Sequence, residues 1–341
     1  MSIFDSIGVV VYISTMAVTQ EIADVIICPR CGKSVRFDDV RIVCEACGSS
    51  FPIIEGVPML VPDGTEDESS LTTERFGYEW KKFDENYKEY EEQFLDWIYP
   101  VTRDFFKDKV VLDAGCGKGK HSVIAESFGA RAVAAVDYGR GSIESARRYI
   151  KEHAKHPERI ALIRGDIRRL PFKPESFDYV YCIGVLHHLP SPKEGLLKLV
   201  SLVKPGGSMS VWVYGYEGNA LVRYTVEPLR KYITSRMPEG ALLAVAWFVT
   251  LPAYAVAKFV YWPISAIAPR LYGKLPMAAY IKMWFDFPFK EIWNIIYDQL
   301  VTPITHYISR EDIEDWLQTA GITKHQVTQR MGFSWRVFLT K

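Results

Sequence analysis

The sequence predicts an α/β protein built on a doubly wound sheet, with a small metal-bound module before the sheet and an apolar helical insertion inside it. Three observations predict this class. Strand and helix patterns alternate from residue 110 onward, two C-x2-C pairs lie upstream, and residues 241–268 contain a single charge, Lys258. With 341 residues, 48% of them hydrophobic, the chain is long enough to bury a substantial core.

Charge and cysteine content narrow the functional classes. The 41 basic and 41 acidic residues balance, so no overall positive field attracts nucleic acid, and a nucleic-acid partner is not expected. Four of the six cysteines lie in the C-x2-C pairs, which favours metal thiolates in a reducing compartment over a secreted disulfide framework. Residues 1–20 read as an N-terminal extension, because the apolar stretch has no basic leader and carries Asp5. We expect a cytoplasmic protein.

The cysteine pairs lie in "CPRCGKSVRFDDVRIVCEACG", where twelve residues separate one C-x2-C from the other. Four thiolates at this spacing on a short hairpin can close a tetrahedral zinc site. Gly32 and Gly48 each follow a pair, where a tight turn requires unusual backbone dihedrals. All four positions are filled by protein, so the zinc is expected to be structural. The predicted ligands are Cys28, Cys31, Cys44 and Cys47.

The module continues with "SSFPIIEGVPMLVPD" and as a whole, over residues 21–63, it resembles the small zinc-ribbon proteins that act as activating subunits of tRNA and protein methyltransferases. The resemblance implies a docking or scaffolding role for the ribbon and says little about the substrate.

Residues 64–107 form the next segment. "DGTEDESS" is acidic and rich in turn formers, which indicates a linker, and the following stretch mixes aromatic and charged residues at mostly helical spacing. Either this helix packs its aromatic stripe on the following domain, or it covers a ligand with Tyr78 or Trp80.

The glycine-rich turn after the first long strand predicts a nucleoside-binding site. "VVLDAGCGKGKHSVIAESFGARAVAAVDYGRGSIESARRYI" reads as strand, turn, helix, strand and helix. Gly115, Gly117 and Gly119 allow the backbone to approach a ligand closely, and Asp137, which ends the second strand, can accept both ribose hydroxyls.

The spacing of the turn distinguishes between nucleosides. A dinucleotide site requires Gly or Ala at the sixth position of G-x-G-x-x-G/A, where this chain has Lys120. The pattern is instead D-x-G-x-G-x-G, beginning at Asp113. An acidic residue before the loop would repel pyrophosphate and suits a ligand that carries an ammonium group.

This pattern resembles motif I of the class I S-adenosylmethionine-dependent methyltransferases. "LIRGDIRRLPF", "FDYVYCIGVLHHL" and "LLKLVSLVKPGGSMSVWVY" agree with later landmarks of the type-11 branch, which includes the ubiquinone and menaquinone methyltransferases. The resemblance covers residues 108–214 and returns at 306–341. It implies a seven-stranded Rossmann-like sheet, S-adenosylmethionine as cofactor, and contact of Asp166 with the adenine amino group. The cofactor-binding residues it implies are Asp113, Ala114, Gly115, Gly117, Gly119, Asp137, Tyr138, Asp166, Ile167 and Ile183.

Two histidines are candidate catalytic residues. Methyl transfer relies on positioning and needs a base only when the acceptor loses a proton. His187 follows the fourth strand, where a cofactor-wall or structural role is the alternative. His306 precedes a helix that Ser309 can cap, where a loop role is the alternative. After this helix we expect "TKHQVTQR" as the sixth strand and "SWRVFLTK" as an antiparallel seventh, inserted between strands five and six.

Residues 215–305 form the apolar insertion, at the place where small-molecule methyltransferases often bind their acceptor. A single membrane span is disfavoured, because the uncharged run is interrupted at Pro252, and crossing once would separate the last strands from their sheet. A buried helical hairpin that turns near Pro252 or Pro263 is one alternative.

An element lying at a membrane surface is the other alternative for the insertion. Residues 215–275 contain seven Lys or Arg and three Glu, and their Trp and Tyr rings suit the headgroup region of a lipid layer. Under this reading the cytoplasmic protein is peripheral to the membrane. Both readings imply a hydrophobic small-molecule or lipid-like acceptor.

The leading hypothesis is therefore methyl transfer to the oxygen or an activated carbon of such an acceptor. No N/D-P-P-Y/F motif is present, which lowers the weight of amine methylation. One alternative is an rRNA or tRNA methyltransferase that reads RNA with its zinc ribbon, which the zero net charge disfavours. Another is a non-catalytic scaffold with the same fold. The acceptor and the oligomeric state are unknown from the sequence.

Overall fold

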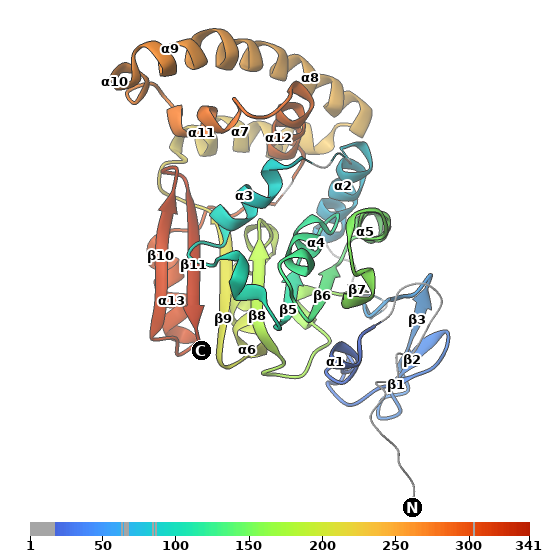
Figure 1. Ribbon diagram of the computed structural model, residues 1–341. Coiled ribbons are helices and arrows are strands. Elements are labelled where there is room, and N and C mark those ends of the chain that lie inside the picture. Colours follow the sequence, from blue (N-terminus) through green and yellow to red (C-terminus); the bar gives the residue numbers. More distant parts are fainter. Residues whose placement is uncertain (1–17, 63, 65–67, 84, 86, 303) are drawn as a thin grey trace, which may run out of the picture.

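The computed structural model describes residues 18–62, 64, 68–83, 85, 87–302 and 304–341 (Figure 1). Most of the predicted N-terminal extension lies outside these residues. The described chain forms a central sheet, a ribbon beside one edge of the sheet, and a helical layer above the carboxyl ends of its parallel strands (Figure 1).

The central sheet has seven strands in the order β10-β11-β9-β8-β5-β6-β7. Strand β11 is antiparallel to both of its neighbours, and β9, β8, β5, β6 and β7 are parallel. The predicted insertion of the seventh strand between the fifth and sixth is therefore confirmed. The strands are β5 (Val110–Ala114), β6 (Ala132–Asp137), β7 (Ile160–Arg164), β8 (Phe177–Ile183), β9 (Val203–Tyr214), β10 (Lys324–Arg330) and β11 (Ser334–Thr340).

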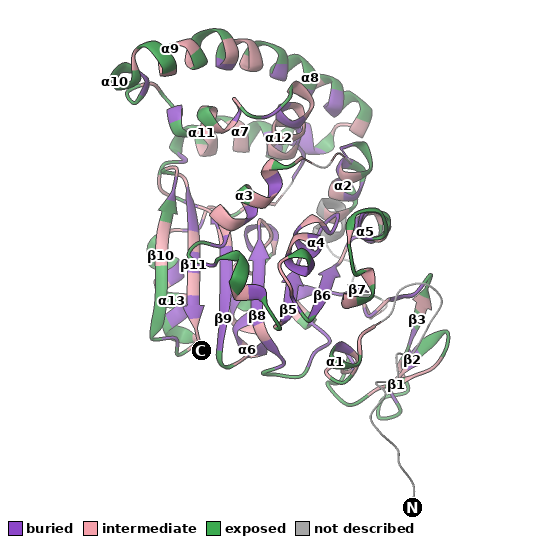
Figure 2. Cartoon of the chain, viewed as in Figure 1, coloured by how far each residue is buried: buried purple, intermediate pink, exposed green. Residues whose placement is uncertain are grey.

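Helices cover both faces of this sheet, and the central strands are buried throughout (Figure 2). Near-continuous burial is typical of parallel strands between helical layers. Ser309 caps α13 in a capping box with Asp312, as predicted for the cap. One apolar core includes side chains of α6 (Pro192–Leu202) and α13 (Arg310–Thr319), and the other includes side chains of α4 (Lys120–Ser127) and α5 (Arg140–His153).

The ribbon extends the edge of the sheet at β7. Met59 forms a parallel bridge with Arg164, and Ile26 pairs with Phe172. The buried side chain of Leu60 belongs to the same apolar core as the sheet. The ribbon is thus packed on the central sheet of its own chain. Its elements are α1 (Gln20–Ala23), β1 (Arg36–Phe37), β2 (Arg41–Val43), β3 (Ser50–Ile54) and β4 (Val57–Pro58).

The segment between ribbon and sheet is helical, as its spacing predicts, with α2 (Glu68–Lys82), α3 (Glu89–Trp97) and the short η1 (Arg103–Phe106). Helix α2 crosses α5 where two glycines meet. A Cβ on Gly77 would lie 2.9 Å from the Cα of Gly141, so the close crossing requires both residues to lack side chains.

The insertion forms the helical layer at the top of Figure 1, and α8, η6 and α9 run on as one helix, Glu239–Ile267. The buried hairpin reading is therefore wrong: Pro252 lies inside α8, and the π-helical η6 precedes Pro263. Such a widened turn re-satisfies the backbone around a proline. The elements are α7 (Ala220–Tyr232), η5 (Thr234–Arg236), α8 (Glu239–Val256), η6 (Ala257–Tyr261), α9 (Trp262–Ile267), α10 (Pro269–Tyr272), α11 (Ala278–Met283) and α12 (Phe289–Val301).

By length and composition this helix could cross a membrane, and only 28% of its most apolar window is buried inside the protein. One such helix is weak support for a span. The buried side of this helix packs on the rest of the insertion. There the indole N–H of Trp293 on α12 donates to the Leu243 carbonyl at 3.1 Å.

Candidate cofactor and acceptor site

A cavity of about 620 Å³ lies between the carboxyl ends of the parallel strands and the helical insertion. The glycine loop, α2 and the ends of β6 and β8 form one part of its wall, and α7, α8 and α12 form the other. Ligands bind at this end of open α/β sheets, because the loops that leave the strands form a crevice there.

The glycine loop lines the cavity with Gly115 and Gly117, which both have positive φ. Asp113, Ala114 and Gly119 are not among the lining residues, so the cofactor contact expected of them stays a prediction that this geometry does not favour. The Asp113 carboxylate lies below the loop, where it accepts from Ser122 Oγ at 2.6 Å, and burial raises its pKa to about 7. Gly119 is the N-cap residue of α4 and has a φ of 82°. These residues support the loop.

Asp137 ends β6 and lines the cavity, as predicted. Its carboxylate accepts from the backbone N–H of Gly117 at 3.0 Å and of Gly139 at 2.9 Å. Burial raises the pKa of Asp137, whereas these N–H donors lower it. Each carboxylate oxygen has a second lone pair, so the residue can hold the loop and still accept a ribose hydroxyl.

Asp166 lies on the same wall, together with Tyr138, Ile167 and Ile183. Its carboxylate accepts two hydrogen bonds from the guanidinium of Arg168 in a bidentate ion pair, with Nη2 to Oδ2 at 2.7 Å and Nε to Oδ1 at 3.0 Å. This ion pair fixes the carboxylate at the cavity wall. The predicted contact of Asp166 with adenine stays a prediction.

Helix α2 adds aromatic rings to the wall. The ring of Trp80 lies against the glycine loop, since a Cβ on Gly117 would be 2.6 Å from it. Phe76 stacks on Trp80 with ring centroids 5.6 Å apart. Tyr78, the other aromatic named in the lid hypothesis, is exposed and absent from this wall. The placement of Trp80 supports the lid reading of this helix.

Glu79 was not predicted from the sequence. Its side chain is 3% exposed and lines the cavity, and no described residue donates a hydrogen bond to Oε2. Burial raises the pKa of Glu79 well above its usual value. An ammonium group in the cavity would donate the missing hydrogen bond, and a sulfonium would pair with the carboxylate by charge, so the site fits a cationic cofactor. An acidic residue within the aromatic stripe of α2 was the available signal.

Neither proposed catalytic histidine lines the cavity. His187 is fully buried, with its ring centroid 4.1 Å from that of Tyr214, and the His306 side chain is exposed. The backbone links them, because the His306 N–H donates to the His187 carbonyl at 2.8 Å. The neighbouring His188 lines the cavity, as does His121 on α4. The Nδ1 of His188 donates to the Ile304 carbonyl at 2.8 Å, and burial lowers the pKa of His188 to about 4. Catalytic roles for His187 and His306 stay predictions that this geometry does not favour.

Asp298 on α12 is a half-buried carboxylate in the wall that sequence reasoning missed, and the buried Glu291 of the same helix is another. The Tyr214 hydroxyl donates to Asp298 Oδ2 at 3.3 Å and accepts from Gln299 Nε2 at 2.9 Å. Burial raises the pKa of Asp298 to about 6. A carboxyl group with a pKa near neutral can exchange a proton at physiological pH.

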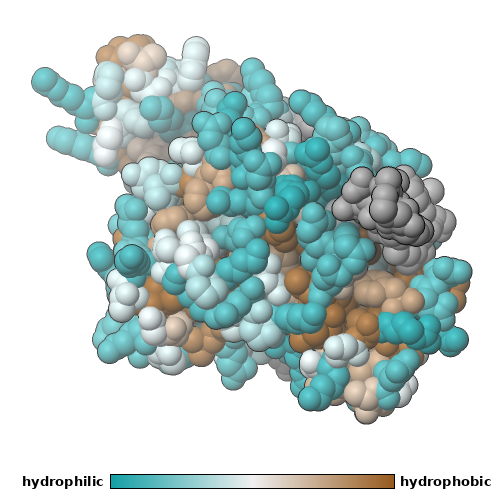
Figure 3. Space-filling model, turned by 60° about the horizontal axis from the view of Figure 1, so that its bottom comes forward, coloured by the Kyte–Doolittle hydropathy of each residue, from teal (hydrophilic) through white to brown (hydrophobic). Residues whose placement is uncertain are grey.

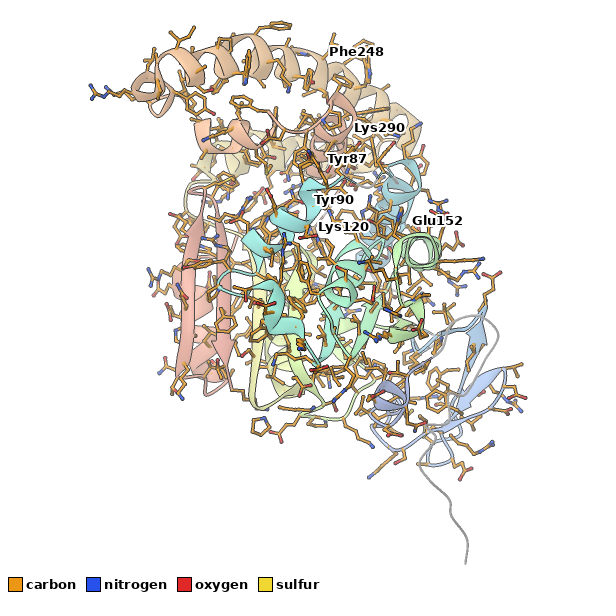
Figure 4. All side chains as sticks on the ribbon, in the orientation of Figure 1. Tyr87, Tyr90, Lys120, Glu152, Phe248 and Lys290 are labelled. Carbon is orange, nitrogen blue, oxygen red and sulfur yellow. The ribbon has the colours of Figure 1, made fainter. Side chains whose placement is uncertain are left out.

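Two lysines of the glycine loop lie at the base of the cavity. Lys118 Nζ donates to the carbonyls of Phe83 at 3.0 Å and Glu85 at 2.9 Å, so the loop is tied to the chain after α2. Lys120 Nζ lies 3.9 Å from the ring centroid of Tyr90 between α3 and α4, and burial lowers its pKa to about 8 (Figure 4).

The four predicted metal ligands meet in the ribbon, with their sulfur atoms all within 4.8 Å of one another. Cys28 and Cys47 Sγ are 3.7 Å apart, and Cys31 and Cys44 Sγ are 3.5 Å apart. Tetrahedral zinc with Zn–S bonds of about 2.3 Å requires sulfur separations of about 3.8 Å. The cluster can therefore hold zinc with all four positions filled by protein. No described ribbon residue lines the cavity.

Comparison with known proteins agrees with this geometry. The methyltransferase domain family matches residues 112–211. A protein of Encephalitozoon cuniculi named "Putative methyltransferase" is 30% identical over 162 residues, which cover 44% of this chain and 67% of that protein. The ubiquinone biosynthesis O-methyltransferase of Schizosaccharomyces pombe is 35% identical over 34% of this chain and 42% of its own length. The demethylmenaquinone methyltransferase of Clavibacter sepedonicus is 32% identical over 33% of this chain and 44% of its own length.

The matches span between about a third and two thirds of the curated relatives. The family match covers the glycine loop and most of the parallel strands, and it ends before the insertion. The matched domain is thus the part of the chain that forms the cofactor half of the cavity. With its sheet order, its loop and its matched domain, the chain belongs to the class I S-adenosylmethionine-dependent methyltransferases.

Proposed function

We propose that this protein methylates an oxygen or an activated carbon of a hydrophobic small-molecule or lipid-like acceptor. One observation carries the proposal: the cavity that begins at the glycine loop continues without a break into the apolar insertion. A cofactor and an apolar acceptor can therefore share one enclosed space, as a displacement between them requires.

Aliphatic side chains line part of the acceptor end of the cavity. Helix α7 contributes Leu221, Val222 and Val226, and α12 contributes Ile295 and Ile296. Apolar walls bind apolar molecules by removing both surfaces from water. Two of the matched relatives are named for ubiquinone biosynthesis and for demethylmenaquinone, which supports a hydrophobic acceptor.

When bound, S-adenosylmethionine supplies an electrophilic methyl group on a sulfonium. The residues around the loop would hold it: Asp137 would accept ribose hydroxyls, and the Glu79 carboxylate would balance its positive charge. Trp80 would cover the loop and exclude water from the reacting atoms. These roles use donors, acceptors and surfaces that face the cavity.

Asp298 is the base we propose for an acceptor that must lose a proton. As the acceptor atom bonds to the methyl carbon, the proton of its O–H or activated C–H would pass to the Asp298 carboxylate. The hydrogen bond from Tyr214 would orient that carboxylate. A pKa of about 6, raised by burial, leaves it mostly ionised at neutral pH and strong enough as a base.

The test is to incubate the purified protein with methyl-labelled S-adenosylmethionine and a lysate of the source organism, and then to extract with organic solvent. Label in the organic phase is the expected result, and mass spectrometry would identify the acceptor. An Asp137→Ala variant is the control for cofactor-dependent labelling. Label confined to RNA or protein would contradict the proposal.

A further inference from the structure

The helix formed by α8, η6 and α9 exposes an unusual amount of apolar surface. Of the twenty-one exposed large hydrophobic side chains in the described part of the chain, seventeen lie between Tyr216 and Met277. We call the exposed side of this helix the outer face; it carries Trp247, Phe248, Leu251, Val256, Phe259, Trp262 and Ile267. Phe248 points away from the molecule in Figure 4 and is 68% exposed, and Phe259 is 80% exposed.

The outer face carries no charge. The one charged residue between Gly240 and Ala268 is Lys258, whose Nζ donates to the Phe285 carbonyl at 2.7 Å. Helix α8 and its continuation span 29 residues, which corresponds to a length of about 43 Å. A helix that faces water normally presents polar residues on that side. By contrast, the bottom of the molecule is mostly hydrophilic (Figure 3).

Exposed basic residues lie at both ends of the outer face. Lys231 and Arg236 precede the helix, and Arg270 and Lys274 follow it. None of these four forms an ion pair with another described residue. The indoles of Trp247 and Trp262 add amphipathic rings to the face itself. Apolar side chains flanked by free cations and Trp match the layered chemistry of an anionic lipid surface.

The cavity opens beside this face. Leu221 on α7, Val249 on α8 and Met277 line the cavity and are also 63%, 47% and 46% exposed. The acceptor end of the cavity thus reaches the same surface as the outer face. A molecule with an apolar tail could pass from lipid into the cavity between these three side chains without exposing the tail to water.

We infer that the outer face docks in the headgroup layer of an anionic bilayer, and that the acceptor enters the cavity from that bilayer. The docking rests on the exposed face and its flanking cations. The path of the acceptor also rests on the proposed function. A second copy of the chain is the competing occupant of the face, but it would leave the four basic side chains without an anionic counterpart.

The experiment is flotation of the full-length protein with vesicles of phosphatidylcholine, with and without phosphatidylglycerol, in the absence of cofactor and acceptor. The test variant combines Phe248→Glu with Phe259→Glu. The matched control combines Val40→Glu with Ile54→Glu, two exposed apolar residues of the ribbon that are 64% and 46% exposed. Unfolding and cofactor binding of both variants verify that they fold.

We expect the wild type and the control to float with phosphatidylglycerol vesicles, and the test variant to lose at least about tenfold in bound fraction. Brominated lipid should quench tryptophan fluorescence, and less so in Trp262→Phe. Equal flotation of the test variant, absence of binding, a dimer in solution that the test variant abolishes, or retention on vesicles after an alkaline carbonate wash would overturn the inference. Failure here leaves the organic-phase labelling unaffected, and failure of that labelling leaves the flotation result intact.

Discussion

Replacing Gly117 with alanine tests the placement of Trp80 over the glycine loop. Gly117 has φ of +56°, and an added Cβ would lie 2.6 Å from the Trp80 ring. The left-handed backbone costs an alanine about 1–2 kcal/mol. The 2.6 Å approach of the Cβ also forces the Trp80 ring to move. Phe76 stacks on Trp80 and restricts the positions to which the ring can move. Since Trp80 lines the cavity, we expect affinity for S-adenosylmethionine to fall at least about tenfold, or about 1.4 kcal/mol.

The matched control is Gly206→Ala. Gly206 has φ of +76°, an added Cβ would meet no atom within 4 Å, and the residue does not line the cavity. Both variants should lose about 1–2 kcal/mol in the free energy of unfolding, measured with denaturant. Calorimetric titration should show weaker cofactor binding for Gly117→Ala alone. Unchanged binding in Gly117→Ala, or an equal loss in Gly206→Ala, would refute the placement of Trp80.

Three further predictions address the base, the cofactor wall and the ribbon. Asp298→Asn should lower kcat by about 10²–10⁴ with a smaller change in KM. The wild-type rate should fall as pH drops below about 6, because burial raises the pKa of Asp298 to about 6 and only the carboxylate accepts a proton; a rate profile that is flat through this range would rule out this base. Asp137→Ala leaves the N–H groups of Gly117 and Gly139 without their acceptor, so unfolding should require about 1–3 kcal/mol less per group and cofactor affinity should drop, as denaturation and calorimetry would measure. Zinc removal by a chelator, or Cys28→Ser, should lower the melting temperature, and an apoprotein that melts like the zinc-loaded protein would disprove a structural metal.

Local patterns were sufficient to predict the cofactor half of the site. The glycine turn and Asp137 end neighbouring parallel strands, and such ends meet at one edge of a sheet. The cysteine pairs fold into one cluster because the hairpin between them is short. Asp113 lies within a strand that is buried on both faces, where its side chain supports the loop from below, and its contact with the cofactor stays a prediction.

Two polar wall residues, Glu79 beside the cofactor and Asp298 beside the acceptor, could not be predicted, because they lie on helices whose positions depend on tertiary packing. Glu79 reaches the cavity through the close crossing of α2 over α5, and Asp298 reaches it through the packing of α12 under α8. Nothing in the sequence around Asp298 marks it as a wall residue, and the signal for Glu79 was only its place within the aromatic stripe of α2. The hairpin alternative predicts a turn near Pro252 or Pro263, whereas the chain keeps its helix past Pro252 and widens into a π turn before Pro263.

The position of the ribbon bears on what the zinc does. The Leu60 N–H donates to the Arg164 carbonyl at 2.8 Å at the end of β7, and Arg164 Nε donates to the carbonyl of Tyr138, which lines the cavity. The ribbon thus supports β7, the edge strand whose Arg164 holds the backbone of Tyr138 in the cofactor wall. The outer face lies at the opposite end of the molecule from the ribbon (Figure 1). A ribbon that bound the acceptor directly would need to reach the cavity, and none of the described ribbon residues lines it. Zinc should therefore influence methylation through stability and cofactor binding, whereas the insertion should determine which acceptor is used.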